Sequence, residues 1–135
     1  MSDARAATVD GQAAIVIAHG DLASGMVSAV QQITGRGERL VPLSNSGMDA
    51  AEMEAKLREL LDRTGARLIF TDLPAGSCNF VACRLLKERR DLVVVTGVNL
   101  PTLLHFAMHD QLPPRDVAEQ AVQRGAPALR VIGEL

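Results

Sequence analysis

Short apolar runs alternate with amphipathic segments along most of the chain. Four of these runs are rich in Val, Ile and Leu and have the length of strands buried on both faces of a sheet. They span residues 13–18, 40–43, 67–71 and 92–96. In the segments after them, apolar residues recur at the spacing of one helix face. These segments predict helices over residues 21–34, 48–64, 78–90, 101–109 and 114–124, and residues 128–132 form a candidate closing strand.

This order of elements predicts the fold class. Strands that alternate with helices form a parallel sheet, because each right-handed crossover places a helix on one face of the sheet. We therefore expect a single-domain, three-layer α/β fold with a mainly parallel sheet in the strand order 2-1-3-4. A length of 135 residues fits one domain. We assign residues 1–12 to a flexible N-terminal segment and residues 13–135 to the domain, with Asp21 expected to cap the first helix.

Composition and charge exclude several classes of function. The formal net charge is -2 and the chain has three Phe but no Tyr or Trp, so it lacks the basic field and the stacking platforms of nucleic-acid binding. No apolar run approaches the roughly 20 residues that span a bilayer, and the first residues do not have the pattern of a signal peptide. We expect a cytoplasmic protein that binds no nucleic acid and does not enter a membrane.

The sequence predicts neither a metal site nor a cofactor. Cys78 and Cys83 are five residues apart, which is a poor spacing for zinc, and we expect both to be buried free thiols. His105 and His109 lie four residues apart on a predicted helix with Asp110 beside them, a spacing that can bind a metal. No third, distant ligand is evident, so we interpret these residues as solvent-facing.

Polar residues follow three of the predicted strands at the carboxyl ends, the edge of a parallel sheet where ligands bind. His19 and Gly20 follow the first strand, residues 72–77 the third and residues 96–99 the fourth. In the order 2-1-3-4 the first and third strands are neighbours, so His19 and Asp72 are expected to meet. The alternatives are an inert core histidine and an Asp72 that caps the next helix.

A histidine beside a carboxylate is suited to phosphoryl transfer. An imidazole that donates one ring N–H to a carboxylate keeps a lone pair on its other nitrogen, and the carboxylate stabilises the ring once it is cationic. The Ser77 hydroxyl, nearby loop amides and a helix N-terminus can surround the transferred oxygens. Gly20 and Gly25 resemble the start of a P-loop, but Met26 and Val27 replace its Lys and Ser or Thr, which disfavours ATP hydrolysis. The first strand is not followed by G-x-G-x-x-G, which disfavours a dinucleotide site.

Three motifs resemble a known family, the mannose-type enzyme IIA proteins of the bacterial sugar phosphotransferase system. They are IVIAHGDLASG at residues 15–25, TDLPAGS at 71–77 and VTGVNLPTLL at 95–104, and the likeness extends over residues 13–135. The resemblance implies that His19 is phosphorylated by the histidine phosphocarrier protein HPr and passes the group to an enzyme IIB. It also implies that Asp72 is the hydrogen-bond partner of His19, with Gly76 and Ser77 at the phosphate.

The family resemblance further implies a homodimer in which a C-terminal strand is exchanged between subunits, so residues 128–132 are expected to complete a neighbour's sheet. It implies no cofactor, and contact with the membrane permease only through enzyme IIB. The loop departs from the family pattern, since Ala75 replaces a glycine and Cys78 a proline. A mannose-type or amino-sugar substrate is expected, and the variant loop is reminiscent of members that serve N-acetylgalactosamine.

Two other functions stay open on the sequence. The phosphodonor subunit of a dihydroxyacetone kinase shares this fold and carries a histidine at the same strand end, although Gly20 and the GVNLP turn favour the sugar system. The second is a regulatory binding module, in which the phosphorylation state of His19 signals to another protein.

Overall fold

The computed structural model describes residues 11–134, so the predicted flexible segment, residues 1–12, lies almost wholly outside the described residues. The strands are β2 (Ala14–Ala18), β3 (Leu40–Ser44), β4 (Leu68–Thr71) and β5 (Val93–Thr96). The helices are α1 (Leu22–Thr34), α2 (Ala50–Thr64), α3 (Ser77–Leu85), α4 (Leu100–Met108) and α5 (Pro114–Gly125). Short 3-10 turns occupy Gly37–Arg39 and Ala126–Ala128. None of the helices within residues 11–134 has both the length and the apolar character that a membrane span requires.

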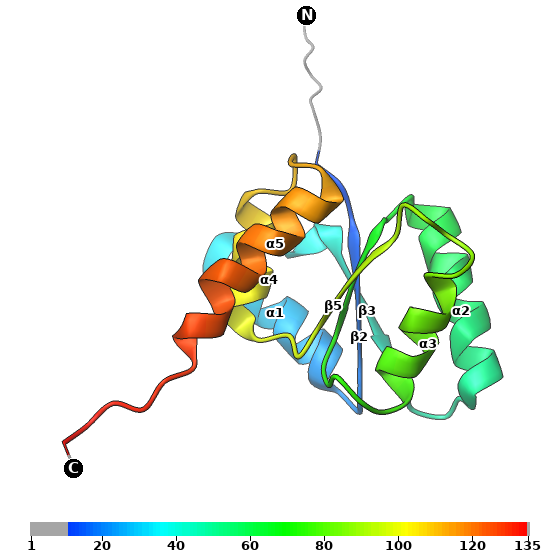
Figure 1. Cartoon of the computed structure of the whole chain (residues 1–135), viewed down its shortest axis with the longest axis horizontal. Helices are drawn as coiled ribbons and strands as arrows, with labels where there is room; N and C mark the ends of the chain where they lie inside the picture. The colour runs from blue at the N-terminus through cyan, green and yellow to red at the C-terminus, as the bar shows by residue number, and fades with distance from the viewer. Residues whose placement is uncertain (1–10, 135) are drawn as a thin grey trace, which may run out of the picture.

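The strands form one parallel sheet in the order β3-β2-β4-β5, which confirms the predicted order 2-1-3-4. The chain moves from β2 outward to β3, and then crosses β2 to reach β4 and β5. Right-handed crossovers in opposite directions place their helices on opposite faces. Accordingly α1, with α4 and α5, covers one face, and α2 and α3 cover the other (Figure 1). The connection after β2 runs to one side of the sheet and the connections to β4 and β5 run to the other side, so the strand order reverses between the neighbours β2 and β4.

The alternating side chains of the central strands fill two cores. Ala14 and Val16 of β2 face the core beneath α1, α4 and α5, while Ile15 and Ile17 face the core beneath α2 and α3. All four are fully buried. Phe70 of β4 packs edge-to-face on Phe106 of α4, with ring centroids 5.8 Å apart, and such pairs add about 0.5–1.5 kcal/mol beyond the burial of apolar area. Burial on both faces explains why these strands read as continuous apolar runs.

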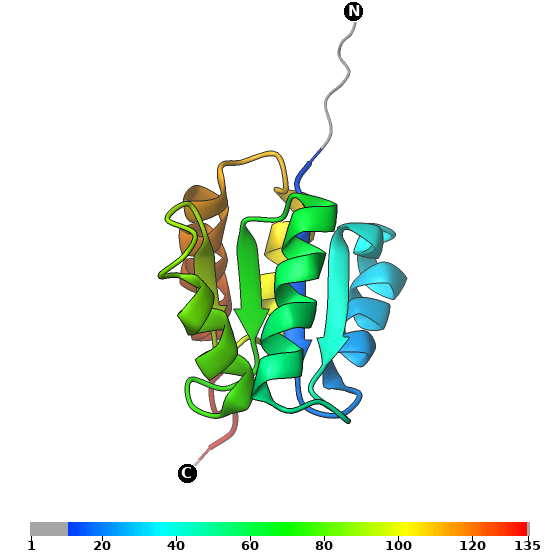
Figure 2. The ribbon, with the colours of Figure 1, turned by 90° about the vertical axis from the view of Figure 1, so that its right-hand side faces the viewer.

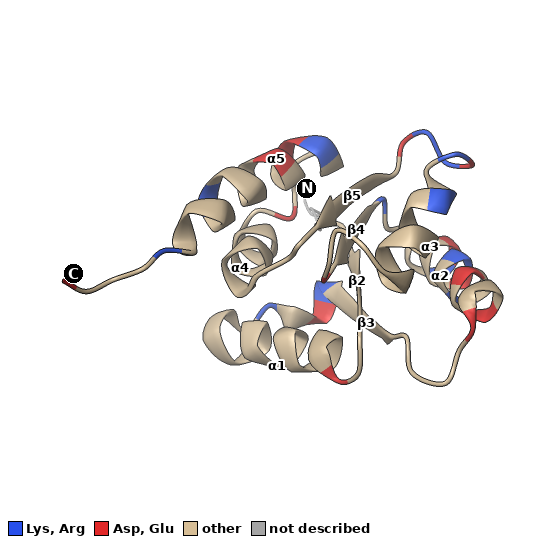
Figure 3. Cartoon of the chain, turned by 60° about the horizontal axis from the view of Figure 1, so that its bottom comes forward, with Lys and Arg blue, Asp and Glu red and all other residues tan. Residues whose placement is uncertain are grey.

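Charged residues of both signs lie along the α2–α3 helix pair (Figure 3). Glu54 of α2 accepts hydrogen bonds from Arg58 on the next turn and from Arg84 of α3, and Arg58 also pairs with Glu88. These ion pairs link α2 to α3 and to the turns that follow it.

Two sequence predictions about helix ends are wrong. Helix α3 ends at Leu85 rather than at residue 90, because the amides of residues 86–88 bond to carbonyls three residues earlier and tighten the chain into turns. Asp21 occupies the N-cap position of α1 but makes no side-chain hydrogen bond there. Residues 128–132 form no strand within the described chain and run away from the body (Figure 1), so their pairing with a neighbour's sheet stays a prediction.

Candidate active site

The parallel strands bring His19 and Asp72 to one edge of the sheet. All strands point toward the same edge (Figure 2), so the residues that follow β2 and β4 emerge side by side. His19 comes directly after β2, and Asp72 directly after β4. The register pairs Ile17 with Thr71, so the two functional residues stand about level across the neighbouring strands. They meet at the point where the direction of the crossovers changes, as predicted for ligand sites in such sheets.

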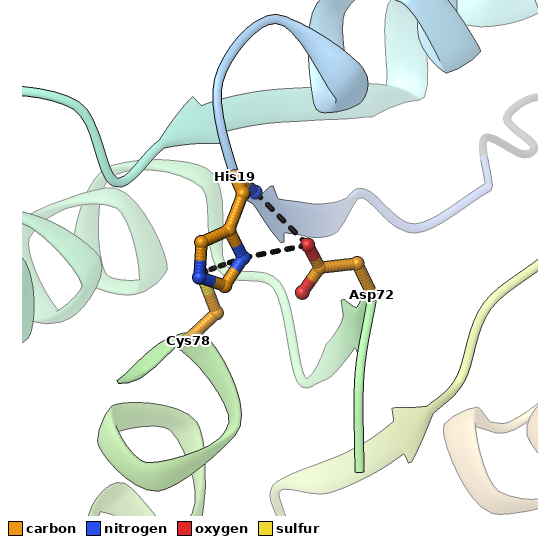
Figure 4. A group of neighbouring side chains, drawn as sticks. All are labelled: His19, Asp72 and Cys78. Carbon is orange, nitrogen blue, oxygen red and sulfur yellow. Dashed lines mark hydrogen bonds and ion pairs between the residues drawn. The ribbon is translucent and has the colours of Figure 1, made fainter. Parts of the chain in front are cut away.

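Asp72 holds His19 by two hydrogen bonds to one oxygen. The backbone N–H of His19 donates to Asp72 Oδ2 at 3.0 Å, and the ring Nδ1 lies 2.8 Å from the same oxygen (Figure 4). The Asp72 side chain is 7% exposed and the His19 side chain 44% exposed. His19 is therefore not a core histidine. Asp72 does not cap α3 either, because Gly76 occupies that N-cap position.

The protonation of the pair follows from its hydrogen bonds. Burial raises the pKa of Asp72, but the backbone N–H and the imidazole of His19 donate to the carboxylate and attract its charge, so the net pKa is lowered. An ionised carboxylate can only accept, which makes Nδ1 the protonated nitrogen. In the neutral ring the lone pair is then on Nε2. The arrangement presents a nucleophilic nitrogen on an exposed ring.

The N-terminus of α3 lies against the histidine ring. Gly76 has a φ of +108°, a conformation that side chains rarely adopt, and a Cβ at this position would lie 3.8 Å from Cε1 of His19. Ser77 is the first residue of the helix. The first amides of a helix have no partner within the helix and carry partial positive charge. Gly76 and Ser77 thus lie at a helix N-terminus, a position that can bind an anion, beside the ring of His19.

Cys78 also belongs to this site, which the sequence alone did not predict. Its side chain is buried, and its Sγ lies 3.8 Å from Nδ1 of His19 (Figure 4). Burial and the charge of Asp72 raise the pKa of the thiol to about 11, against a lowering contribution from Ser77. Cys83 is exposed, so the prediction of two buried thiols is wrong for it. The two residues are five positions apart on α3 and therefore occupy different faces of the helix.

Hydrogen bonds from the end of β3 also hold the loop after His19 in place. Asn45 follows β3, and its Oδ1 accepts a hydrogen bond from the backbone N–H of Gly20 at 3.1 Å. The Ser44 hydroxyl donates to the carbonyl of Gly20 at 2.7 Å, and the amide of Asn45 bonds to the carbonyl of Ala18. Sequence analysis missed Ser44 and Asn45. Their position in the sequence could have identified them, because they lie at the carboxyl end of β3, which is the other neighbour of β2.

A buried polar cluster holds the Asp72 loop on the other side. The Thr71 side chain is fully buried, and its hydroxyl donates to Oδ1 of Asn79 at 3.1 Å. A hydroxyl has one hydrogen, so at its 2.9 Å contact with the hydroxyl of Thr96 it accepts. The amide of Asn79 in turn donates to the carbonyl of Pro74. Asp72 is thus positioned by neighbours on β5 and α3.

The other two histidines lie together on α4. The rings of His105 and His109 stack with centroids 4.3 Å apart, and Nε2 of His105 lies 3.1 Å from Oε1 of Gln120. Asp110 is buried and pairs with Arg36, so the prediction that it faces solvent is wrong. Within residues 11–134 the one group of three or more possible metal ligands is His19, Asp72 and Cys78.

Three solved structures that are similar to this chain are IIA components of phosphotransferase systems. The mannose/sorbose-specific IIA subunit from Enterococcus faecalis is 22% identical, with 93% of this chain and 98% of that chain covered and a TM-score of 0.79. The component EIIA from Streptococcus agalactiae is 22% identical over 88% of this chain and 95% of its own, with a TM-score of 0.80. The IIA protein associated with the fucose utilization operon of Streptococcus pneumoniae is 24% identical over 90% and 93%, with a TM-score of 0.76. At these identities the likeness demonstrates the fold.

Sequence comparison defines the family. Curated proteins gave no match. The model of the family EIIA-man, described as the fructose IIA component of the PTS system, matches residues 13–120. That range includes all strands, all the site residues described above and most of α5. The chain therefore belongs to the EIIA-man family of phosphotransferase-system IIA components.

Proposed function

We propose that this protein is a phosphocarrier of a sugar phosphotransferase system, in which His19 accepts a phosphoryl group from phospho-HPr and passes it to an enzyme IIB. Membership of the EIIA-man family supports this role. The observation that carries the proposal is the 2.8 Å contact between Nδ1 of His19 and Oδ2 of Asp72 on a ring that is 44% exposed. This contact leaves Nε2 free to attack phosphorus.

In the proposed transfer, the phosphoryl group moves from a histidine of the donor to His19. A P–N bond forms at Nε2 of His19 as the P–N bond of the donor's phosphohistidine breaks, and the donor imidazole leaves with that electron pair. The ring of His19 gains positive charge, which the carboxylate of Asp72 stabilises through the proton on Nδ1. Gly76 and Ser77 are proposed to bind the phosphoryl oxygens through the first amides of α3 and the Ser77 hydroxyl. Transfer to enzyme IIB repeats the step with His19 as the donor.

The surroundings of the site suit transient contact with partner proteins. Three apolar side chains on the elements that carry the site are about half exposed: Leu22 of α1, Leu73 of the Asp72 loop and Phe80 of α3. Exposed apolar residues that surround a polar centre are typical of protein-interaction surfaces. We infer that this rim contacts HPr and enzyme IIB in turn. A sugar of the mannose or amino-sugar type is the proposed cargo of the system.

A homodimer with an exchanged C-terminal segment also fits the chain. Leu129, Val131 and Ile132 are 89%, 98% and 83% exposed. Within the described residues β5 pairs only with β4, so its other edge is open to a further strand. Open edges and extended apolar segments favour strand addition. Sedimentation of the full chain is expected to give a dimer and truncation after Ala128 a monomer, whereas a monomeric full chain would contradict the proposal.

The phosphocarrier role is tested by intact mass after incubation with phosphoenolpyruvate, enzyme I and HPr. We expect one acid-labile phosphoryl adduct on the wild type and none on His19→Ala. His109→Ala is the matched control, since it removes another exposed imidazole and should keep the adduct. An adduct that persists in His19→Ala would refute the assigned nucleophile. No adduct on the wild type, in an assay that phosphorylates another IIA protein, would favour the regulatory binding module.

A further inference from the structure

Three side chains with different donor atoms converge at the site although they are distant in sequence. His19 follows β2, Asp72 follows β4 and Cys78 lies in the first turn of α3. Nδ1 of the histidine lies 2.8 Å from Oδ2 of the aspartate and 3.8 Å from Sγ of the cysteine. One ligand atom from each residue lies within 4.8 Å of the others (Figure 4). Nitrogen, oxygen and sulfur donors can together ligate one tetrahedral metal ion.

Asp72 supplies a second, independent indication of a ligand. Its side chain is more than nine-tenths buried, yet Oδ1 has no hydrogen-bond partner among the described residues. A buried carboxylate oxygen without a partner is costly, because its desolvation is not compensated. Both carboxylate oxygens are on the side of Asp72 that faces His19 and Cys78 (Figure 4). A cation bound through Oδ2 between the three residues would lie close to Oδ1 and compensate its charge.

We propose that His19, Asp72 and Cys78 form a binding site for a thiophilic divalent cation such as Zn²⁺, and that its occupancy competes with phosphorylation of His19. In a tetrahedral zinc site, bonds of about 2.0–2.3 Å place the ligand atoms roughly 3.3–3.8 Å apart. The distance from Nδ1 to Sγ, 3.8 Å, already fits. The distance from Nδ1 to Oδ2 has to open from 2.8 Å by about half an ångström as the metal replaces the proton between them. The exposed side of His19 leaves the fourth position to water.

Protons and charges balance on binding. The cation takes the place of the proton on Nδ1, and because a neutral imidazole carries one N–H proton, the ring takes up a proton from solvent at Nε2 in its place. The net release to solvent is the proton of the Cys78 thiol, because a coordinating thiol is deprotonated by the metal itself. The lone pair that attacks phosphorus is therefore absent while the metal is bound. By linkage, phosphorylation of Nε2 weakens metal binding by the same factor. This competition rests on the proposed function, whereas the metal site itself does not.

The donor set selects the class of cation. Mg²⁺ and Ca²⁺ need six or more oxygen ligands, and this site offers one carboxylate. Zn²⁺, and Co²⁺ as its spectroscopic substitute, accept mixed sulfur, nitrogen and oxygen ligands. The spacing of Cys78 and Cys83 is poor for zinc, and the structure pairs Cys78 with distant residues instead. This is why the sequence predicted no metal.

The first test is titration of the full, chelator-treated chain with Co²⁺, followed by its thiolate-to-cobalt charge-transfer absorption. We expect one equivalent to give this band in the wild type and in the control Cys83→Ser. Cys78→Ser should lose the band and bind Zn²⁺ at least about tenfold more weakly, since even indirect partners of metal ligands contribute 10–100-fold. His19→Ala should also weaken binding, and circular dichroism establishes that each variant is folded. A wild type without the band, or a folded Cys78→Ser that keeps it, would overturn the metal site.

The second test compares the rate of phosphoryl acceptance with and without Zn²⁺, each variant being measured against its own metal-free rate. Zinc should inhibit the wild type and Cys83→Ser at concentrations that leave phosphorylation of HPr unchanged. The inhibitory concentration should rise at least about tenfold in Cys78→Ser. Equal zinc sensitivity of Cys78→Ser and the wild type would overturn the competition. A cobalt band in a protein that accepts no phosphoryl group would refute the proposed function and leave the metal site standing.

Discussion

The packing of α5 on the start of α4 gives a sharp prediction for Gly125. A Cβ at Gly125 would lie 2.2 Å from Cγ2 of Thr102 and 2.9 Å from Oδ1 of Asn99. These two residues form the capping box of α4, and the side-chain amide of Asn99 also donates to the carbonyl of Gly125 at 2.9 Å. Gly125→Ala therefore forces a methyl group into the capping box that begins at Asn99 within the GVNLP turn. We expect this substitution to destabilise the protein.

The magnitude follows from three opposing effects. Van der Waals contacts need about 3.5–4.0 Å, so either the Cβ or the side chain of Thr102 must move by more than an ångström, and such overpacking costs about 1–3 kcal/mol. Displacing the Asn99 cap costs about 1 kcal/mol more. Gly125 has helical backbone angles, with φ -84°, so alanine gains back about 1 kcal/mol of helix propensity. The net expectation is a loss of about 1–3 kcal/mol.

Gly25→Ala is the matched control within the same protein. Gly25 lies in α1, and a Cβ there meets no atom within 4 Å. The same chemical change should therefore stabilise the protein by about 0.5–1 kcal/mol. The assay is urea unfolding of the wild type and both variants, with the shift in midpoint converted at a common m value. A Gly125→Ala variant as stable as Gly25→Ala would refute the described contact between α5 and the cap of α4.

Three further predictions concern the site. Asp72→Asn should slow phosphoryl acceptance by about 10²-fold or more, because an amide neither fixes the proton on Nδ1 of His19 nor stabilises the cationic ring; a rate within a few-fold of the wild type would contradict this role. Because the folded-state pKa of Asp72 is lowered, its contribution to stability is complete above the unfolded value of about 3.9 and is lost as pH falls through the folded value. The difference in unfolding free energy between wild type and Asp72→Asn should therefore shrink below about pH 4, and a difference that stays constant down to pH 3 would disprove the linkage. Cys83 should react with a thiol reagent much faster than Cys78, which is buried and whose pKa is raised to about 11; Cys83→Ser should abolish the fast phase, and a fast phase left in that variant would contradict the burial of Cys78.

Much of the fold and the central contact could be predicted from the chain because both depend on strong local signals. Residues 13–18 and 67–71 are apolar runs that a buried parallel sheet requires, and the handedness of crossovers limits the order of the strands. Once these strands are neighbours, His19 and Asp72 must lie close together. The topology predicted that the two residues meet, the family resemblance implied the bond to the ring, and the bond from the backbone N–H of His19 was not predicted.

The parts that sequence analysis missed depend on contacts between elements. Ser44 and Asn45 are common loop residues, and only the placement of β3 beside β2 brings them to Gly20. The face of α3 that turns inward is set by packing on the sheet, which buries Cys78 and leaves Cys83 exposed. The apolar segment 128–132 carries a strand signal, but within one chain it has no partner.

The two nitrogens of His19 explain why one site can support both a phosphoryl group and a metal ion but not both at once. Nε2 is a nucleophile only while Nδ1 carries a proton, and Asp72 keeps that proton in place through Oδ2. When a cation binds Nδ1, the single N–H proton of the neutral ring is on Nε2 instead. Cys78, at 3.8 Å from Nδ1, supplies the sulfur that makes such a cation selective. A proline at this position, as in the family loop, would keep the Asp72–His19 pair but remove the third ligand. The cysteine therefore adds sensitivity to metal ions without being required for the nucleophile.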